Sequence, residues 1–387
     1  MNRIAVLGAS GFVGTTLVER LSNKAYDVRP FMNSGRDAWR LARLGIQIGR
    51  LNVLDYSEVE RALGDCTHVV NCIMGDDRVM IDGLKNILRA CGRLRVKRFV
   101  HLSSITAYGE PPPPDSIHED AIPRPARGTY GWIKLSQDRI VQRSAARGLP
   151  CSILCPPIVS GPHSPQLLCL LDAIRLRKFA LVDSGYAPCS LVDVENLAQA
   201  IELSLHTDSG PGRLFVVDDY CASWREVIDS IASVIGPWLP LPEISRAEAQ
   251  RILASPERPR GSLLGTLRFL ASRDTRTVLR RDPILASVES FASRMIRRIK
   301  PHDAGRGGRK PVRSNIHSAL ADSNSFDRLF LARQLRGVRH SSQRAQDRIS
   351  YRPEVTFERS MSRFSAWHAE VSGQNDPNAD LIAHLET

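Results

Sequence analysis

One stretch near the N-terminus, residues 4–14, constrains the fold more than any other part of the chain. A short apolar run there meets three glycines at three-residue spacing, and apolar residues at helical spacing follow. This order predicts a strand, a tight turn and a helix, with backbone N–H groups free at the helix start to bind a pyrophosphate. We therefore predict a dinucleotide site. Its predicted contacts are Gly8, Ser10, Gly11, Phe12, Val13 and Gly14.

The first 155 residues alternate apolar strand-like segments with amphipathic helical segments. This alternation is typical of a parallel sheet covered by helices. Strands are predicted at residues 4–7, 27–32, 46–50, 68–73, 98–103 and 151–154, and helices at 14–21, 38–44, 56–63, 79–91 and 130–147. We therefore expect an α/β fold with a doubly wound parallel sheet, and we assign residues 1–155 to a Rossmann-type NAD(P)-binding domain.

Beyond residue 155 the predicted elements mix, which indicates a smaller α+β lobe. We assign residues 156–254 and 349–371 to this substrate-binding lobe. It would hold helices at 165–176, 194–205 and 223–235, the last with a capping box from Ser223 and Glu226, and a strand at 214–217. Residues 255–348 are assigned to a basic, partly helical insertion, and residues 372–387 to a polar tail.

A phenol, an ammonium and a hydroxyl form the candidate reaction centre. Tyr130 and Lys134 are four residues apart on a predicted helix and therefore share a face. A nearby ammonium would lower the pKa of Tyr130 and suit it to proton transfer at a carbinol or carbonyl. Ser104 follows a predicted strand at the carboxyl edge of the sheet, where it could hydrogen-bond the reacting oxygen. The alternative is that these are ordinary polar residues on a helix and at a strand end.

Taken together, these segments resemble the extended short-chain dehydrogenases/reductases, a family that includes nucleotide-sugar epimerases and dehydratases. The resemblance covers roughly residues 1–235 and rests on the glycine turn, on Tyr130 with Lys134, and on residues 52–55, 103–109, 156–162 and 190–198; residues 351–369 resemble the closing segment of the family. It implies that Ser104, Tyr130 and Lys134 form a catalytic triad, which Asn86 completes to a tetrad.

The sequence departs from the family pattern around the cofactor. The acidic residue that would hold an NAD ribose hydroxyl at the end of the second strand is absent. Arg36, with Ser34, could bind a 2′-phosphate instead, or Arg36 could be a solvated loop residue. We therefore expect NADP ahead of NAD. Asn52 and Val53 are predicted cofactor contacts near the adenine. Asn52 replaces an Asp that is usual there in the family, and Cys155 replaces a common Arg.

The function that we expect first is an NAD(P)-dependent oxidoreductase or 4-epimerase-like enzyme that acts on a nucleotide-sugar. Tyr130 would take the hydroxyl proton as hydride moves to the nicotinamide, while Lys134 would anchor the ribose. Ile105 stands where dehydratases of the family carry an acid, which argues against dehydration. The alternatives are an NADPH-dependent reductase or dehydrogenase of a sterol-like or other apolar carbonyl, and a non-catalytic NADP(H)-sensing protein.

The net charge of +12 is concentrated in one segment, since residues 251–313 hold 16 Lys or Arg against five Asp or Glu. Such a segment could contact an anionic membrane surface through residues 255–313, where an amphipathic stretch at 287–300 would lie on the lipid. The alternative is that its apolar side packs on the enzyme. Nucleic-acid binding is not expected, because no recognition motif accompanies the charge. A homodimer is kept as an alternative to a monomer.

The location that we expect is the cytoplasm, with an option for peripheral attachment to the membrane. The first predicted strand begins almost at residue 1, which leaves no room for a signal peptide. No apolar run approaches the ~18 residues of a membrane span. The eight cysteines show no CxxC pair and no metal-ligand spacing, which indicates free thiols and no metal site.

Overall fold

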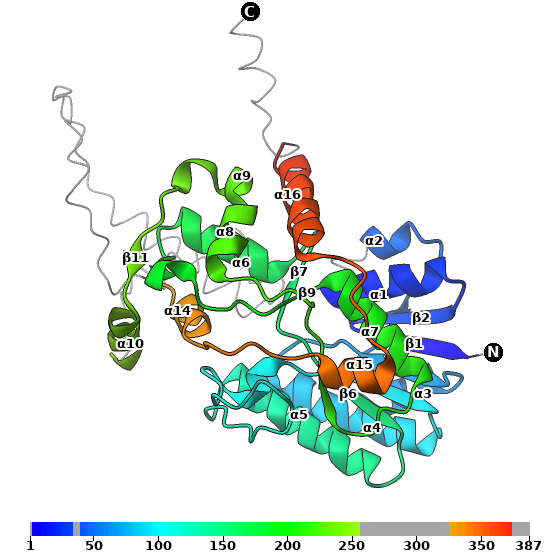
Figure 1. The fold of residues 1–387 in the computed structure, drawn as a ribbon. Coiled ribbons are helices and arrows are strands. Elements are labelled where there is room, and N and C mark those ends of the chain that lie inside the picture. The colour runs from blue at the N-terminus through cyan, green and yellow to red at the C-terminus, as the bar shows by residue number, and fades with distance from the viewer. Residues whose placement is uncertain (1, 34–38, 256–325, 374–387) are drawn as a thin grey trace, which may run out of the picture. The chain divides into compact units, whose positions relative to one another are not determined.

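A seven-stranded parallel sheet is the framework of the computed structural model (Figure 1), in the order β10-β6-β5-β4-β1-β2-β3. Its strands are β1 (Arg3–Leu7), β2 (Asp27–Met32), β3 (Gly49–Arg50), β4 (His68–Asn71), β5 (Arg98–Leu102), β6 (Cys151–Cys155) and β10 (Arg213–Phe215). The chain runs outward from β1 to β3, returns to the centre, and runs outward again from β4. This is the doubly wound α/β topology predicted from the sequence.

The structure describes residues 2–33, 39–255 and 326–373. The chain divides into one unit with Met1–Gln250 and Asn324–Thr387 and a second unit with Arg251–Ser323. The elements below belong to the first unit, except that α10 (Arg246–Ala254) continues past Gln250 into the second. The predicted 2′-phosphate contacts Ser34 and Arg36, most of the basic insertion and the polar tail lie outside the described residues. In the described ranges, no helix is long and apolar enough to cross a membrane.

Helices cover both faces of the large sheet (Figure 1). One face packs against α3 (Tyr56–Leu63), α4 (Leu84–Arg93) and α5 (Tyr130–Ala145), and the other against α1 (Phe12–Asn23), α2 (Trp39–Ala42), α7 (Val194–His206) and α15 (Gln343–Ile349). Alternate residues of β1 enter the two cores, Ala5 and Leu7 on one side and Ile4 and Val6 on the other. Ile4, Val6 and Leu7 each contribute about 1.5–3 kcal/mol on burial. Because both faces of the sheet are covered, residues 4–7 of β1 form a continuous apolar run.

Three elements lie in a different place from the one expected. Residues 194–205 and 214–217 were predicted in the C-terminal lobe, but α7 packs on α1, and β10 pairs in parallel with β6. The helix α15, from the predicted insertion, buries Ala345 and Ile349 against the same core. The periodicity of a short segment reports which face is apolar, and it carries no information on which sheet the segment joins.

A smaller lobe surrounds an aromatic core that includes Phe179, Trp224, Phe330 and Phe364. Two small parallel sheets pair β7 (Ile158–Ser160) with β9 (Leu191–Asp193) and β8 (Leu181–Val182) with β11 (Glu243–Ile244). The helices of this region are α6 (Pro165–Arg175), α8 (Trp224–Ser230), α9 (Ala232–Ile235), α10 (Arg246–Ala254), α14 (Arg328–Gln334) and α16 (Phe357–Gly373). The predicted capping box of Ser223 and Glu226 is present at α8. All eight cysteines are free thiols.

Alanine substitutions at Gly14 and, as a control, at Gly92 test how closely α1 approaches the turn after β1. A Cβ atom on Gly14 would lie 2.3 Å from the carbonyl oxygen of Gly8, whereas one on Gly92 in α4 would meet nothing within 4 Å. Gly14→Ala is therefore expected to lower the free energy of unfolding by about 1–3 kcal/mol, as overpacking does. Gly92→Ala should raise it by about 0.5–1 kcal/mol, because alanine favours the helix. Urea denaturation measures both; equal effects would contradict the close approach.

Candidate active site

The turn between β1 and α1 is held in a conformation that glycine permits. Gly8 has a φ of +78°, and the N–H groups of Gly8 and Ala9 both donate to the carbonyl oxygen of Phe31 at 3.0 Å. A Cβ on Gly8 would lie 2.9 Å from the backbone of Cys72. The turn is therefore fastened to β2 and packed against the end of β4, and larger residues are excluded from it.

The start of α1 offers backbone donors to an anion. Gly11 occupies the N-cap position without a side chain to bond the first-turn N–H groups, and this turn contains no acidic residue. Gly11 is exposed, and Ser10, Phe12 and Val13 are half-buried around it. Because a helix start carries partial positive charge, these residues fit a pyrophosphate. The glycine turn therefore has the shape and polarity that a dinucleotide needs.

The loop after β3 is braced by Asn86 of α4. The side-chain nitrogen of Asn86 donates to the carbonyl oxygens of Val53 at 3.0 Å and Leu54 at 3.2 Å. Asn52 is exposed, and its side-chain oxygen accepts from the N–H of Leu54 at 3.1 Å. Asn86 thus holds the loop in which Asn52 and Val53 were predicted to meet the adenine. Its membership of a catalytic tetrad stays a prediction.

Lys134 fastens α5 to the end of β5. Its ammonium donates to the carbonyl oxygen of Leu102 at 2.8 Å, and the residue is 2% exposed. Its Nζ lies 5.7 Å from the centre of the Tyr130 ring. Tyr130 is the first residue of α5, directly after the N-cap Thr129. The predicted pair therefore lies on one face of the helix, next to the carboxyl end of β5.

Ser104 lies on the short segment that follows β5 and begins a 3₁₀ turn, η2 (Ile105–Tyr108). Its hydroxyl oxygen accepts from the N–H of Thr106 at 3.2 Å and from the Thr106 hydroxyl at 3.0 Å. The Ser104 proton is thus left to donate elsewhere. A Cβ on Gly131 would lie 2.2 Å from the Thr106 carbonyl oxygen, so α5 and η2 are in close contact. This contact brings the segments of Ser104 and Tyr130 together.

Tyr130 is partly exposed at the carboxyl edge of the sheet. Tyr130 is 40% exposed and Met74, in the loop after β4, is 63% exposed. The hydroxyl donates to the Met74 sulfur at 3.6 Å. A substrate oxygen would have to replace this weak acceptor. Met74 and Gly131 were not predicted as site residues. The signals that could have indicated them are the position of Met74 near the end of a strand and the position of Gly131 directly after Tyr130.

Burial sets the direction of both key pKa values. Burial lowers the pKa of Lys134 to about 8, although the charge of Asp138 opposes the shift. Burial raises the pKa of Tyr130; Asp138 adds to this shift, and the positive charge of Arg333 reduces it. The pKa of Tyr130 is therefore raised in this structure, where a lowered value was expected, because desolvation outweighs the nearby cations.

A buried ion pair lies one helical turn beyond Lys134. Arg213 of β10 donates from Nε to Asp138 of α5 at 2.6 Å, and Asp138 is fully buried. Burial raises the pKa of Asp138, and the guanidinium of Arg213 lowers it. The sequence prediction omitted this pair, although the position of Asp138 four residues after Lys134 is a signal that could have indicated it.

Two arginines of α14 and the segment after it face one carboxylate. Arg336 pairs with Glu110, and the Nε atom of Arg333 lies 3.7 Å from the same carboxylate. The Arg333 side chain is 15% exposed, and its Nε has no hydrogen-bond partner among the described residues. Burial and Arg336 lower the pKa of Arg333. One carboxylate for two guanidinium groups leaves positive charge that acts on Tyr130.

The sequence matches the model of the NAD dependent epimerase/dehydratase family over residues 4–217. A ketoreductase of Stigmatella aurantiaca, which acts on a farnesylated dihydroquinoline oxide by its name, is 25% identical over 222 residues, 54% of this chain and 66% of that protein. Cinnamoyl-CoA reductase 1 of Petunia hybrida is 23% identical over 264 residues, 62% of this chain and 79% of that protein.

Solved structures share the fold. UDP-glucose 4-epimerase of Thermotoga maritima with UDP-glucose aligns with a TM-score of 0.64 and 15% identity, covering 96% of this chain and 99% of that one. The dTDP-glucose 4,6-dehydratase of Bacillus anthracis in complex with NAD gives a TM-score of 0.64 and 14% identity, with 96% and 97% covered. At these identities the likeness is one of fold.

The buried ion pair can be tested by removing one partner. Arg213→Met would leave the Asp138 carboxylate buried without its cation and is expected to lower the free energy of unfolding by about 3–5 kcal/mol. The control, Lys85→Met, breaks the pair with Asp82, in which both side chains are more than half exposed, and should change stability little. Chemical denaturation compares the two variants, and a similar small effect for both would show that Asp138 needs no counter-charge.

Proposed function

Because the chain belongs to the NAD dependent epimerase/dehydratase family, we propose that Tyr130 transfers the proton in a reaction that interconverts an alcohol and a carbonyl. The enzyme is an NAD(P)-dependent oxidoreductase or epimerase. This function excludes the alternative of a non-catalytic NADP(H)-sensing protein. The observation that carries the proposal is the position of Tyr130, a partly exposed residue at the carboxyl edge of the sheet and one helical turn from the buried ammonium of Lys134.

The cofactor supplies hydride chemistry when it is bound. The glycine turn would hold its pyrophosphate, Asn52 and Val53 its adenine, and Lys134 its nicotinamide ribose. We keep NADP ahead of NAD on the sequence of residues 33–36, which contains no acid. Gly11 supports the fit, because it exposes the start of α1 without a capping side chain.

Each of the three triad residues has a defined part in the proposed proton transfer. The raised pKa of Tyr130 keeps its hydroxyl protonated at neutral pH, so it can donate to a carbonyl oxygen. Ser104 already accepts two bonds from Thr106 and would donate its own proton to the same oxygen. Lys134, with a pKa of about 8, is mostly charged at neutral pH and stabilises negative charge on the phenol.

A nucleotide-sugar is the substrate that we propose first, in a 4-epimerase-like reaction. Arg333 and Arg336 share a single carboxylate, Glu110, and the charge of Arg333 reaches Tyr130. Buried guanidinium groups with spare donors suit a diphosphate. One solved structure of the same fold holds UDP-glucose, and another holds UDP-glucuronic acid and NAD, which agrees with this choice.

A reductase of an apolar carbonyl is the second candidate, and two observations favour it. The Stigmatella aurantiaca and Petunia hybrida relatives are both named as reductases. The raised pKa of Tyr130 also keeps the phenol protonated at neutral pH, which is the state from which the reducing direction starts. The two candidates differ in outcome, because an epimerase regenerates its cofactor and a reductase consumes NADPH.

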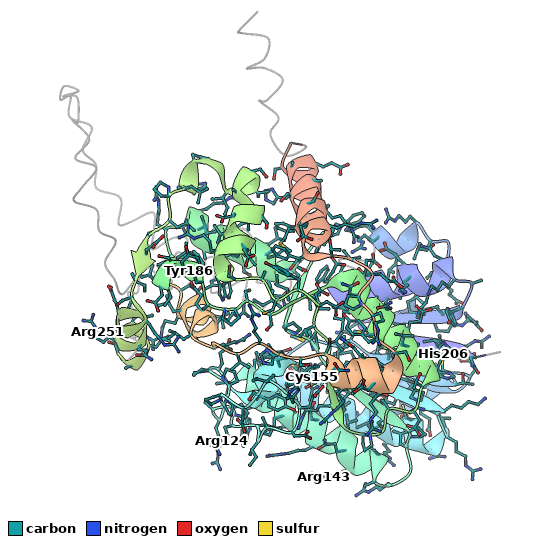
Figure 2. All side chains as sticks on the ribbon, in the orientation of Figure 1. Arg124, Arg143, Cys155, Tyr186, His206 and Arg251 are labelled. Carbon is teal, nitrogen blue, oxygen red and sulfur yellow. The ribbon has the colours of Figure 1, made fainter. Side chains whose placement is uncertain are left out.

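Tyr130→Phe tests the catalytic assignment and the substrate class together. Loss of the phenolic proton should reduce kcat by about 10²–10⁴-fold. Tyr186→Phe is the control, because Tyr186 is 76% exposed on the smaller lobe (Figure 2) and should keep wild-type activity. Enzyme is incubated with UDP-sugars, read by chromatography of the epimers, and with carbonyl compounds and NADPH, read at 340 nm. Full activity of Tyr130→Phe on every substrate turned over would refute the assignment.

The pH dependence should report Lys134. Since its pKa is lowered to about 8, the ammonium loses its charge above that pH, and kcat/KM should fall there. Asp138→Asn removes a carboxylate that raises the pKa of Lys134, so the alkaline limb should move to lower pH. Asp229→Asn, at an exposed site on α8, should leave the limb in place. An alkaline limb that Asp138→Asn does not move would exclude Lys134 as its origin.

A further inference from the structure

A groove of about 770 Å³ lies between α4, along most of its length, and the C-terminal part of α5. Its wall is built from these helix segments and from the turns that lead into β5 and β6. The floor is apolar and includes Leu88, Val96 and Ile140, whereas seven basic side chains and no acidic side chain surround it. This combination of an apolar floor and a cationic rim is not needed by the proposed reaction.

Most of the positive charge in the groove has no carboxylate partner. Lys85 pairs with Asp82 at 2.8 Å, and Arg93 pairs with Glu60 at 2.9 Å. The other five basic residues have no carboxylate within 4.0 Å in the part of the chain that the structure describes. They are Arg89, Arg95, Lys97, Arg143 and Arg147. A surface with this surplus of positive charge attracts anions.

Helix polarity explains only part of this cluster. A basic residue in the last turn of a helix is favoured by the helix dipole, which accounts for Arg93 in α4 and Arg143 in α5. Arg95, Lys97 and Arg147 follow the helix ends and gain less from it, because the effect fades beyond the last turn. Arg89 instead stacks on Tyr56, with its guanidinium carbon 4.1 Å from the ring centre.

The groove is separate from the candidate active site. Val96 and Lys97 precede β5 and Pro150 precedes β6, so the groove lies at the amino ends of these strands. Ser104 follows the carboxyl end of β5. The strand has five residues, which span about 17 Å. Figure 2 labels Arg143 on the side of the sheet that α4 and α5 cover.

We propose that this groove binds an organic polyphosphate, with the phosphoryl groups on the arginine rim and an apolar or aromatic group on the floor. Arginine side chains bind phosphates with paired donors and also stack on planar rings. The volume is within the range of small-molecule sites, about 300–1,000 Å³. A second copy of the chain is the poorer occupant, because it would bring the same cations to face this rim.

Calorimetric titration with ATP tests the proposal, on enzyme saturated with NADPH so that the dinucleotide site is filled. Arg143→Glu reverses one charge of the rim and should weaken ATP binding at least tenfold. Arg139→Glu makes the same change on the same helix at an exposed residue that does not line the groove, and should alter binding less than twofold. Circular dichroism checks that both variants fold.

Three results would overturn the site. The first is no ATP binding at low salt, and the second is equal weakening in Arg143→Glu and Arg139→Glu, which would indicate general attraction to a basic surface. The third is release of NADPH by ATP, seen as a change in cofactor fluorescence, which would place ATP in the dinucleotide site. Inorganic pyrophosphate should bind at least threefold more weakly than ATP, because it has nothing to place on Leu88 and Ile140; equal affinity would overturn the role of the floor.

Discussion

The hydrogen bond from the Lys134 ammonium to the Leu102 carbonyl is the interaction on which the candidate active site depends. A buried ammonium is costly without a partner, and this one is satisfied by the last residue of a central strand. The bond fixes α5 against β5, and the missing side chain of Gly131 lets the helix touch the turn that follows Ser104. The phenol, the hydroxyl and the ammonium are therefore positioned by one strand and one helix.

Charge is distributed over the fold so that two positive regions lie apart. In the core between α5 and β10, the charges of Asp138 and Arg213 neutralise each other. At the carboxyl edge of the sheet, the uncapped start of α1 and the arginine pair around Glu110 present positive charge to a ligand. A second positive region, the groove, lies at the amino ends of β5 and β6. The two regions are kept apart by the length of the strands, from their amino ends to their carboxyl ends.

Much of the sheet, and the placement of Ser104 and Tyr130 on neighbouring segments, could be predicted from residue order. All six strands predicted in the first 155 residues are present, although the third is reduced to Gly49–Arg50. Strand ends that follow one another in a parallel sheet meet at the same edge. The position of Arg333 near the candidate active site could not be predicted in this way, because Arg333 belongs to a stretch assigned to the insertion. It reaches the site since α14 packs Phe330 into the aromatic core of the smaller lobe, a long-range contact that local periodicity does not encode.

The glycine turn, the doubly wound sheet and the shared helix face of Tyr130 and Lys134 follow from residue order, because each depends on local spacing and backbone freedom. The direction of the Tyr130 pKa, the pairing of Asp138 with Arg213 and the place of β10 in the large sheet follow from the folded arrangement. These features depend on desolvation and on contacts between residues far apart in the chain. Burial and long-range pairing appear only when the elements have packed.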